Sequence, residues 1–133
     1  MQDIFNTPPD SVFYEDNKLF VALAYDSLTK GHSVIVWRDK VEDINSLSSN
    51  DYDYLMDVVN VTRETLKVYY KVEKVYLMYL DEVKQVHWHL IPRYNEKGFN
   101  VLNHTPNKLD NFDDAIKLQE NFKKNQYKMM VEN

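Results

Sequence analysis

Two histidines alternate with apolar residues in the segment Gln85–Ile91, which reads Gln-Val-His-Trp-His-Leu-Ile. Successive side chains of a β-strand point to opposite faces, so Gln85, His87 and His89 would share one face of a strand. The two imidazoles would then lie roughly 6–7 Å apart along the strand. The apolar residues between them would face a core. The spacing therefore predicts a row of two imidazoles and one amide on one face of a strand.

Three kinds of chemistry fit this row. A metal site could combine His87 and His89 with a third ligand such as His32. A nucleophilic site could use one imidazole to attack a phosphorus or a carbonyl carbon. A structural role would bond both rings to the neighbouring main chain. No acidic residue within the strand completes a metal-ligand set, which weakens the first interpretation, but the residues alone leave all three open.

The composition narrows the class of protein and of partner. The chain has 133 residues, which predicts one domain over residues 1–133. Sixteen basic against 21 acidic residues give a net charge of −5, which argues against nucleic acid and anionic membranes as partners. The sequence has no cysteine, which excludes thiolate nucleophiles and favours a reducing, cytoplasmic location. The first residues lack the basic start of a secretory signal, and the apolar run Leu19–Tyr25 is far shorter than the ~20 residues of a membrane span.

The elements that must position the histidine row alternate between strands and helices. Hydrophobic patterns predict strands at Ser11–Glu15, Lys18–Ala24, Ser33–Trp37, Val75–Leu80 and Gln85–Arg93. The near-continuous apolar character of Val75–Leu80 predicts that both of its faces are covered. Helical spacing predicts a long helix at Asn50–Lys71 and a final helix at Phe112–Lys124, with an ordered loop at Tyr94–Leu109. The expected class is α+β, with a five-stranded antiparallel sheet packed by one long helix plus a C-terminal helix.

The histidine row resembles the signature of the histidine triad (HIT) family, in which three histidines alternate with apolar residues and Pro-Arg often follows. Gln85–Arg93 supplies the match, as Gln-Val-His-Trp-His-Leu-Ile-Pro-Arg. Gly31-His32, followed by Ser-Val-Ile-Val, is similar to the family's Gly-His strand. Val41–Ile44 resembles the segment that leads into the family's long helix. The order of the elements also agrees, so the resemblance covers roughly residues 11–93 and implies a HIT-like fold.

The resemblance also implies an activity and roles for the histidines. Family members hydrolyse or transfer nucleoside monophosphate groups, typically from dinucleoside polyphosphates, nucleoside phosphoramidates or nucleotide sugars. The middle histidine of the triad, here His87, is the nucleophile, and a neutral imidazole suits attack on the α-phosphorus. The resemblance assigns His89 to the phosphate and leaving group, and His32 to the wall behind the nucleophile. It further implies a nucleotide substrate, a homodimer, and no metal or other cofactor.

Several residues depart from the family pattern. Gln85 occupies the first triad position, where its side chain can form hydrogen bonds but can carry neither a proton nor a charge. An acidic residue common eight positions before the Gly-His histidine is Ala24 here, and Asp26 is the candidate to substitute for it in binding. Arg93 is the basic residue that could steer phosphate, and Trp37 replaces a common proline. The alternative function is therefore a nucleotide-binding HIT-like protein with reduced or no catalysis.

Overall fold

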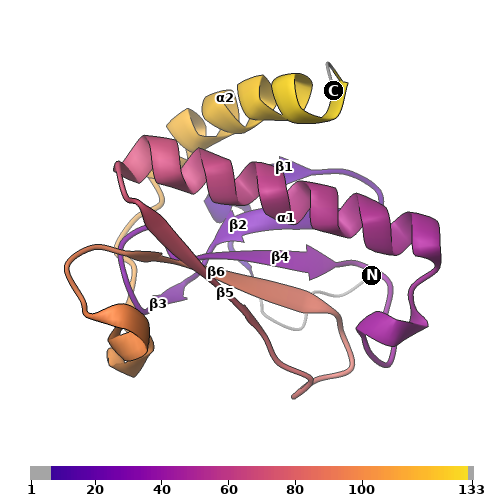
Figure 1. The fold of residues 1–133 in the computed structure, drawn as a ribbon, viewed down its shortest axis with the longest axis horizontal. Coiled ribbons are helices and arrows are strands. Elements are labelled where there is room, and N and C mark those ends of the chain that lie inside the picture. The colour runs from indigo at the N-terminus through magenta and orange to yellow at the C-terminus, as the bar shows by residue number, and fades with distance from the viewer. Residues whose placement is uncertain (1–6, 132–133) are drawn as a thin grey trace.

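The structure is a computed structural model that describes residues 7–131, and its central element is a five-stranded antiparallel sheet (Figure 1). The strands follow each other across the sheet in the order β1 (Val12–Glu15), β2 (Leu19–Leu23), β4 (Ser33–Trp37), β6 (His87–Arg93) and β5 (Lys74–Tyr79). All neighbouring pairs are antiparallel. The predicted α+β class and its five-stranded antiparallel sheet are confirmed.

A second, two-stranded sheet lies beside the main one. It pairs β3 (Asp26–Ser27) with β7 (Asn107–Lys108), and Asp26 lies opposite Lys108. The loop predicted from Tyr94 to Leu109 therefore contains a strand, together with the 3-10 helix η3 (Gly98–Asn103). Strands of two polar residues carry no hydrophobic pattern, which explains why neither β3 nor β7 was predicted.

Two helices lie on the same side of the sheet, where α2 covers α1 and β1 (Figure 1). Helix α1 spans Ser49–Tyr70 and α2 spans Asp114–Gln126. The side chain of Ser48 accepts a hydrogen bond from the main-chain N–H of Asp51 at 3.1 Å, so Ser48 caps α1. Both predicted helices are confirmed, with ends shifted by one or two residues.

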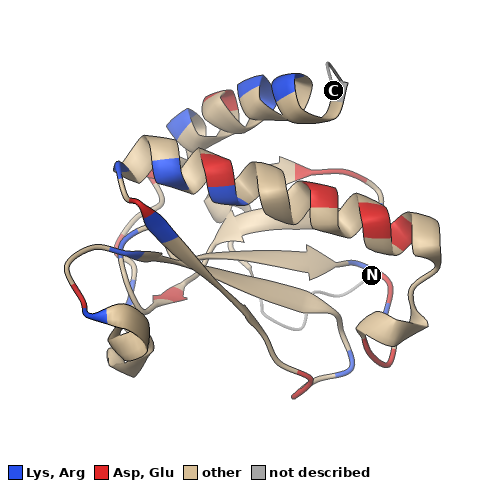
Figure 2. Cartoon of the chain, in the orientation of Figure 1, with Lys and Arg blue, Asp and Glu red and all other residues tan. Residues whose placement is uncertain are grey.

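Charged residues avoid the centre of the sheet (Figure 2). Strands β2 and β4 contain no lysine, arginine, aspartate or glutamate, whereas both helices carry charges on their exposed surface. Among residues 7–131, no helix is long and apolar enough to cross a membrane. The cytoplasmic location and the absence of nucleic-acid and membrane partners stay predictions.

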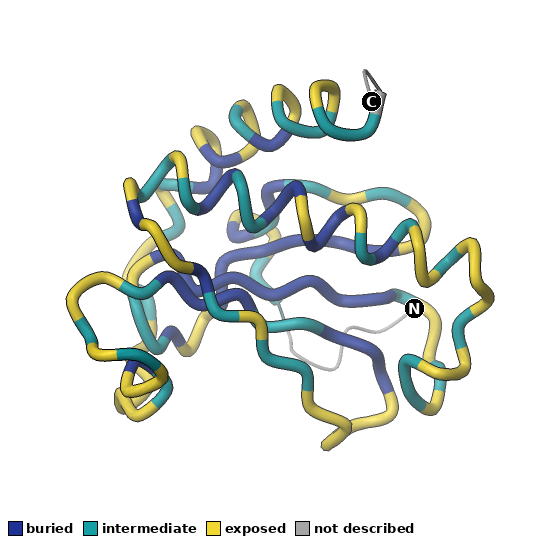
Figure 3. Tube along the Cα trace, viewed as in Figure 1, coloured by how far each residue is buried: buried dark blue, intermediate teal, exposed yellow. Residues whose placement is uncertain are grey.

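The central strands are buried on both faces (Figure 3). On the helix side, the main core includes Leu19, Val21, Leu23, Ile35, Trp37 and Leu90 of the sheet and Leu55, Val58, Leu66 and Phe122 of the helices. On the opposite side, a smaller cluster consists of Phe20, Ala22, Ala24, Val34 and Val36. The sheet therefore has a helix face and a second face that neither α1 nor α2 covers, which we call the open face.

Strand β5 differs from the prediction that both of its faces are covered. It is the last strand of the sheet, and only Val75 among its residues is buried. Leu77 is 42% exposed. The prediction is wrong because the faces of a strand at the edge of a sheet are covered less than those of a central strand. The apolar character of β5 gives no information about its place in the sheet.

Candidate active site

The pairing of β4 with β6 places the two histidines of the signature on the open face. Val36 lies opposite His87 and Val34 lies opposite His89. Residues directly opposite each other in an antiparallel pair point to the same side, and both valines belong to the open-face cluster. His87 and His89 therefore share one face, as their spacing predicts, and that face is the one without helices.

Gln85 lies outside strand β6, which begins at His87. The strand predicted from Gln85 to Arg93 is therefore two residues too long at its start. The Gln85 side chain is buried, and its Nε2 donates a hydrogen bond to the carbonyl oxygen of Trp37 at 2.9 Å. Gln85 thus neighbours the histidines, but its amide is directed to the main chain of β4.

His32 precedes β4 and contacts His89 of the signature strand. The main-chain N–H of Leu28 donates to His32 Nδ1 at 3.0 Å, so a neutral His32 ring carries its proton on Nε2. His32 Nε2 lies 3.0 Å from His89 Nδ1 and donates to it. His89 must then carry its own proton on Nε2. The structure therefore brings His32 to His89 and sets the tautomers of both rings.

His87 has the opposite tautomer. Its Nδ1 lies 2.9 Å from the carbonyl oxygen of Gln85, which can only accept, so Nδ1 is protonated and the lone pair is on Nε2. The rings of His87 and His89 are 5.2 Å apart between centroids, at an angle of 80°. The row thus combines an imidazole whose lone pair is on Nε2 with a neighbouring imidazole that has an Nε2–H donor.

Burial keeps the two supporting imidazoles neutral. Desolvation, and secondly the neighbouring His89, lower the pKa of His32 to about 3. Desolvation, and secondly the neighbouring His87, lower the pKa of His89 to about 4. Both rings are therefore neutral near pH 7. The two hydrogen bonds require this, because each ring accepts one of them on a ring nitrogen.

These pKa values predict that the protein is less stable in mild acid. Unfolded histidines take up protons near pH 6.5, whereas folded His32 and His89 do so only near pH 3 and 4. The stabilisation that the two neutral histidines contribute is complete above their unfolded pKa. It is lost as the pH falls toward their folded pKa values. Between about pH 7 and pH 5 the free energy of unfolding should fall by on the order of 1 kcal/mol per histidine.

Urea unfolding across this pH range measures the effect. Thr62→Val, which removes a buried hydrogen bond in α1 and no titratable group, should keep the same slope. Asp16 and Glu96, whose pKa values are lowered, titrate below this window. Equal stability at pH 7 and pH 5 would contradict the lowered pKa values of His32 and His89.

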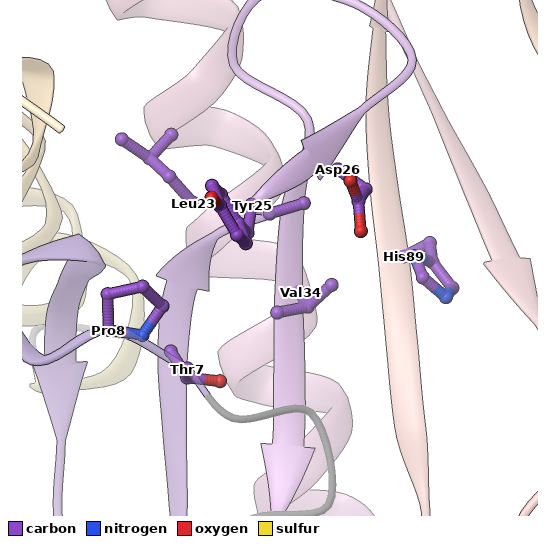
Figure 4. A pocket seen from close by; sticks show the side chains of 8 residues that line it. Thr7, Pro8, Leu23, Tyr25, Asp26, Val34 and His89 are labelled. Carbon is purple, nitrogen blue, oxygen red and sulfur yellow. The ribbon is translucent and has the colours of Figure 1, made fainter. Parts of the chain in front are cut away.

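A pocket of about 240 Å³ opens beside His89 (Figure 4). Its lining consists of Thr7, Pro8, Leu23, Ala24, Tyr25, Asp26, Val34 and His89. In Figure 4, Val34 lies between Thr7 and Pro8 on one side and Asp26 and His89 on the other. The structure therefore brings Asp26 to the same pocket as His89, although the two are far apart in the sequence.

Arg93 does not line this pocket. It ends β6, four residues after His89, which corresponds to about 13 Å along a strand. Sequence patterns did not indicate the position of Lys108, whose Nζ lies 5.6 Å from the centre of the ring of Tyr25, one of the residues that line the pocket. Only the β3–β7 pairing brings Lys108 there, and no pattern in the sequence signals that pairing.

The histidines are poorly arranged to bind a metal ion. Among residues 7–131, no three or more histidine, aspartate or glutamate side chains form a group that could hold one. The hydrogen bonds explain this, because the Nδ1 lone pairs of His32 and His89 already accept from Leu28 and His32. In these tautomers neither His32 nor His89 has a second ring lone pair to offer a metal ion.

The fold and the histidine row define the class of protein. The model of the HIT domain family matches residues 6–96, which is more than half of the chain. The chain therefore belongs to the HIT domain family. The match ends before η3, so Lys108 and helix α2 lie outside it.

Solved structures show the same fold. The Caenorhabditis elegans NitFhit protein superposes with a TM-score of 0.74 at 20% identity, over 91% of this chain and 29% of that chain. Plasmodium falciparum diadenosine triphosphate hydrolase superposes with a TM-score of 0.69 at 16% identity, over 91% of this chain and 82% of that chain. A hypothetical histidine triad nucleotide-binding protein from Sulfolobus tokodaii superposes with a TM-score of 0.68 at 18% identity, over 92% of this chain and 89% of that chain. None of the curated proteins matches the sequence.

Proposed function

We propose that the protein hydrolyses or transfers a nucleoside monophosphate group through a nucleotidyl-histidine intermediate on His87. The observation that carries this proposal is the bond from His87 Nδ1–H to the carbonyl oxygen of Gln85, at 2.9 Å, which leaves the lone pair on Nε2. Membership of the HIT family supports a nucleotide as the ligand. The pocket beside His89 supplies a place for the nucleoside.

The reaction has two steps. His87 Nε2 attacks the α-phosphorus, the bond from phosphorus to the leaving oxygen or nitrogen breaks, and that atom leaves with the electron pair and is protonated. The Nδ1–H bond to Gln85 stabilises the positive charge that develops on the ring. The Nε2–H of His89 donates to the phosphate or to the leaving atom. Water then attacks the phosphorus and loses one proton to the solvent, which balances the proton taken up by the leaving atom. The P–N bond breaks with its electron pair on Nε2, which restores neutral His87.

The pocket and one of the relatives support a proposal for the substrate class. The walls at Leu23, Ala24 and Val34 are apolar and suit a nucleobase, while the Asp26 carboxylate can accept hydrogen bonds from ribose hydroxyls. The Plasmodium relative is a diadenosine triphosphate hydrolase. We therefore propose dinucleoside polyphosphates or nucleoside phosphoramidates as substrates.

Incubation with diadenosine polyphosphates and adenosine phosphoramidates tests this function directly. Chromatography should show AMP accumulating in step with the second product. Rapid acid quenching should show an intact chain heavier by one nucleotidyl group. Substrates of both kinds that stay intact would count against catalysis.

Gln85 favours a second candidate function, a nucleotide-binding protein with little catalysis. It stands where the family has a histidine, and its side chain bonds to the main chain of Trp37. In this case AMP would raise the melting temperature, while turnover would stay at background. Thermal unfolding with and without AMP, combined with the product assay, separates the two candidates.

Asp26→Asn should weaken substrate binding more than it slows chemistry. The carboxylate lines the pocket, so its loss removes an acceptor that ground state and transition state use equally. We expect KM to rise about tenfold and kcat to change less than about twofold. Asp53→Asn, an exposed change on α1, is the matched control. An unchanged KM for Asp26→Asn would show that this carboxylate does not contact the substrate.

We also propose that the protein is a homodimer. Strand β5 forms an edge of the sheet, and Leu77 on it and Leu80 just after it are 42% and 37% exposed. A second copy would cover these side chains and the unpaired edge. Light scattering at micromolar concentration should give twice the chain mass of 15.9 kDa. A mass equal to that of one chain would contradict the dimer.

A further inference from the structure

Two residues that depart from the family pattern contact each other. Gln85 replaces the first triad histidine, and Trp37 replaces the proline that often follows the Gly-His strand. Gln85 Nε2 donates to the carbonyl oxygen of Trp37 at 2.9 Å, and the main-chain N–H of Trp37 donates to the carbonyl oxygen of Val86 at 2.9 Å. A proline at position 37 would lack the second donor. The two departures therefore make one joint contact between β4 and the residues that lead into β6.

This contact extends the β4–β6 ladder by one step. The last pair in register is Val36 with His87, and the Trp37–Val86 bond follows it. Gln85 and Trp37 are 2% and 3% exposed, so water cannot replace either bond. Residues 81–84 just before them are all exposed. The hydrogen bonds that attach this segment to β4 therefore begin at Gln85.

The segment that is bonded to Trp37 also carries the atom that sets the tautomer of His87. The carbonyl oxygen of Gln85 accepts from His87 Nδ1 at 2.9 Å. The position of this oxygen depends on the main chain at residue 85, which the side-chain amide ties to Trp37. A glutamine amide always offers N–H donors to Trp37, whereas a neutral histidine offers one donor, on only one of its ring nitrogens.

We propose that Gln85 is a positioning residue, whose side-chain bond to Trp37 and main-chain bond to His87 together keep His87 in the Nδ1–H tautomer. The proposal rests on the proposed role of His87 as the nucleophile. Gln85 contacts His87 and not the substrate. The glutamine thus takes a positioning role at the first position of the triad.

Gln85→Met tests this role, because methionine keeps the length of the side chain and removes the donor to Trp37. Long-range ¹H–¹⁵N NMR spectra of the histidine rings report the tautomer without any need for turnover. Wild-type His87 should show Nδ1–H alone, and Gln85→Met should show a mixture of tautomers. We expect kcat to fall about 10–100-fold with little change in KM. Gln85→His can still donate to Trp37 from one ring nitrogen, so its kcat should fall less than that of Gln85→Met.

Thr62→Val is the matched control, since it removes another buried side-chain bond, from Thr62 to the carbonyl oxygen of Val58 at 2.7 Å in α1. It should lower stability and leave the His87 signals unchanged. Gln85→Asn, one carbon shorter, replaces Gln85→Met if that variant does not fold. The proposal is overturned if either folded variant keeps Nδ1–H as the single tautomer of His87. Absence of turnover in the wild type would instead refute the proposed function, and the NMR comparison would still decide the role of Gln85.

Discussion

Replacing His87 with alanine should lower kcat by on the order of 10³-fold or more and leave nucleotide binding largely intact. The substitution removes the only atom proposed to form the covalent bond to phosphorus. His89 cannot take over, because its Nδ1 lone pair accepts from His32 and its Nε2 carries a proton. His32 cannot do so either, because its Nδ1 accepts from the main chain of Leu28. The loss should therefore appear in kcat and not in KM.

Steady-state kinetics and calorimetric titration with AMP separate chemistry from binding in His87→Ala. The intact mass after acid quenching should show the nucleotidyl adduct in the wild type and not in the variant. His104→Ala is the control, since His104 is exposed and pairs with Glu96 away from the row. If His87→Ala turned over substrate at the wild-type rate, the row of imidazoles would be structural.

The second large effect concerns stability, and Gly31→Ala should lower the free energy of unfolding by on the order of 3 kcal/mol. Gly31 has a φ of +87°, where a side chain is strained. A Cβ at this position would lie 2.3 Å from Cε2 of Tyr70. The ring cannot easily move away, because its hydroxyl donates to Asp114 at 2.9 Å and ties α1 to α2.

Gly98→Ala is a control for the backbone contribution alone. Gly98 also has a positive φ, of +52°, but no atom lies within 4 Å of the added Cβ. Gly98→Ala should therefore lower the free energy of unfolding by about 1 kcal/mol. Urea unfolding of both variants measures the difference between them. Equal destabilisation would show that the Tyr70 ring moves aside at little cost, contrary to the prediction.

Local patterns in the sequence were sufficient for the elements that carry the site. The run of β-branched residues predicted β4 from Ser33 to Trp37 with both ends correct. Helical spacing predicted α1 to within one residue at each end. The alternation of His87 and His89 with apolar residues predicted their shared face. Each of these features depends on neighbours along the chain, so the sequence alone could determine it.

The tertiary structure decided how these residues work together. His32 meets His89 across 57 positions of sequence, and Gln85 meets Trp37 across 48. Asp26 reaches the pocket beside His89, while Arg93 remains at the far end of its strand. Hydrogen bonds between distant residues depend on strand register and leave no periodic pattern in the sequence. For this reason the sequence determined that His87 and His89 share one face, and only the packed sheet determined which nitrogen of each histidine carries the proton.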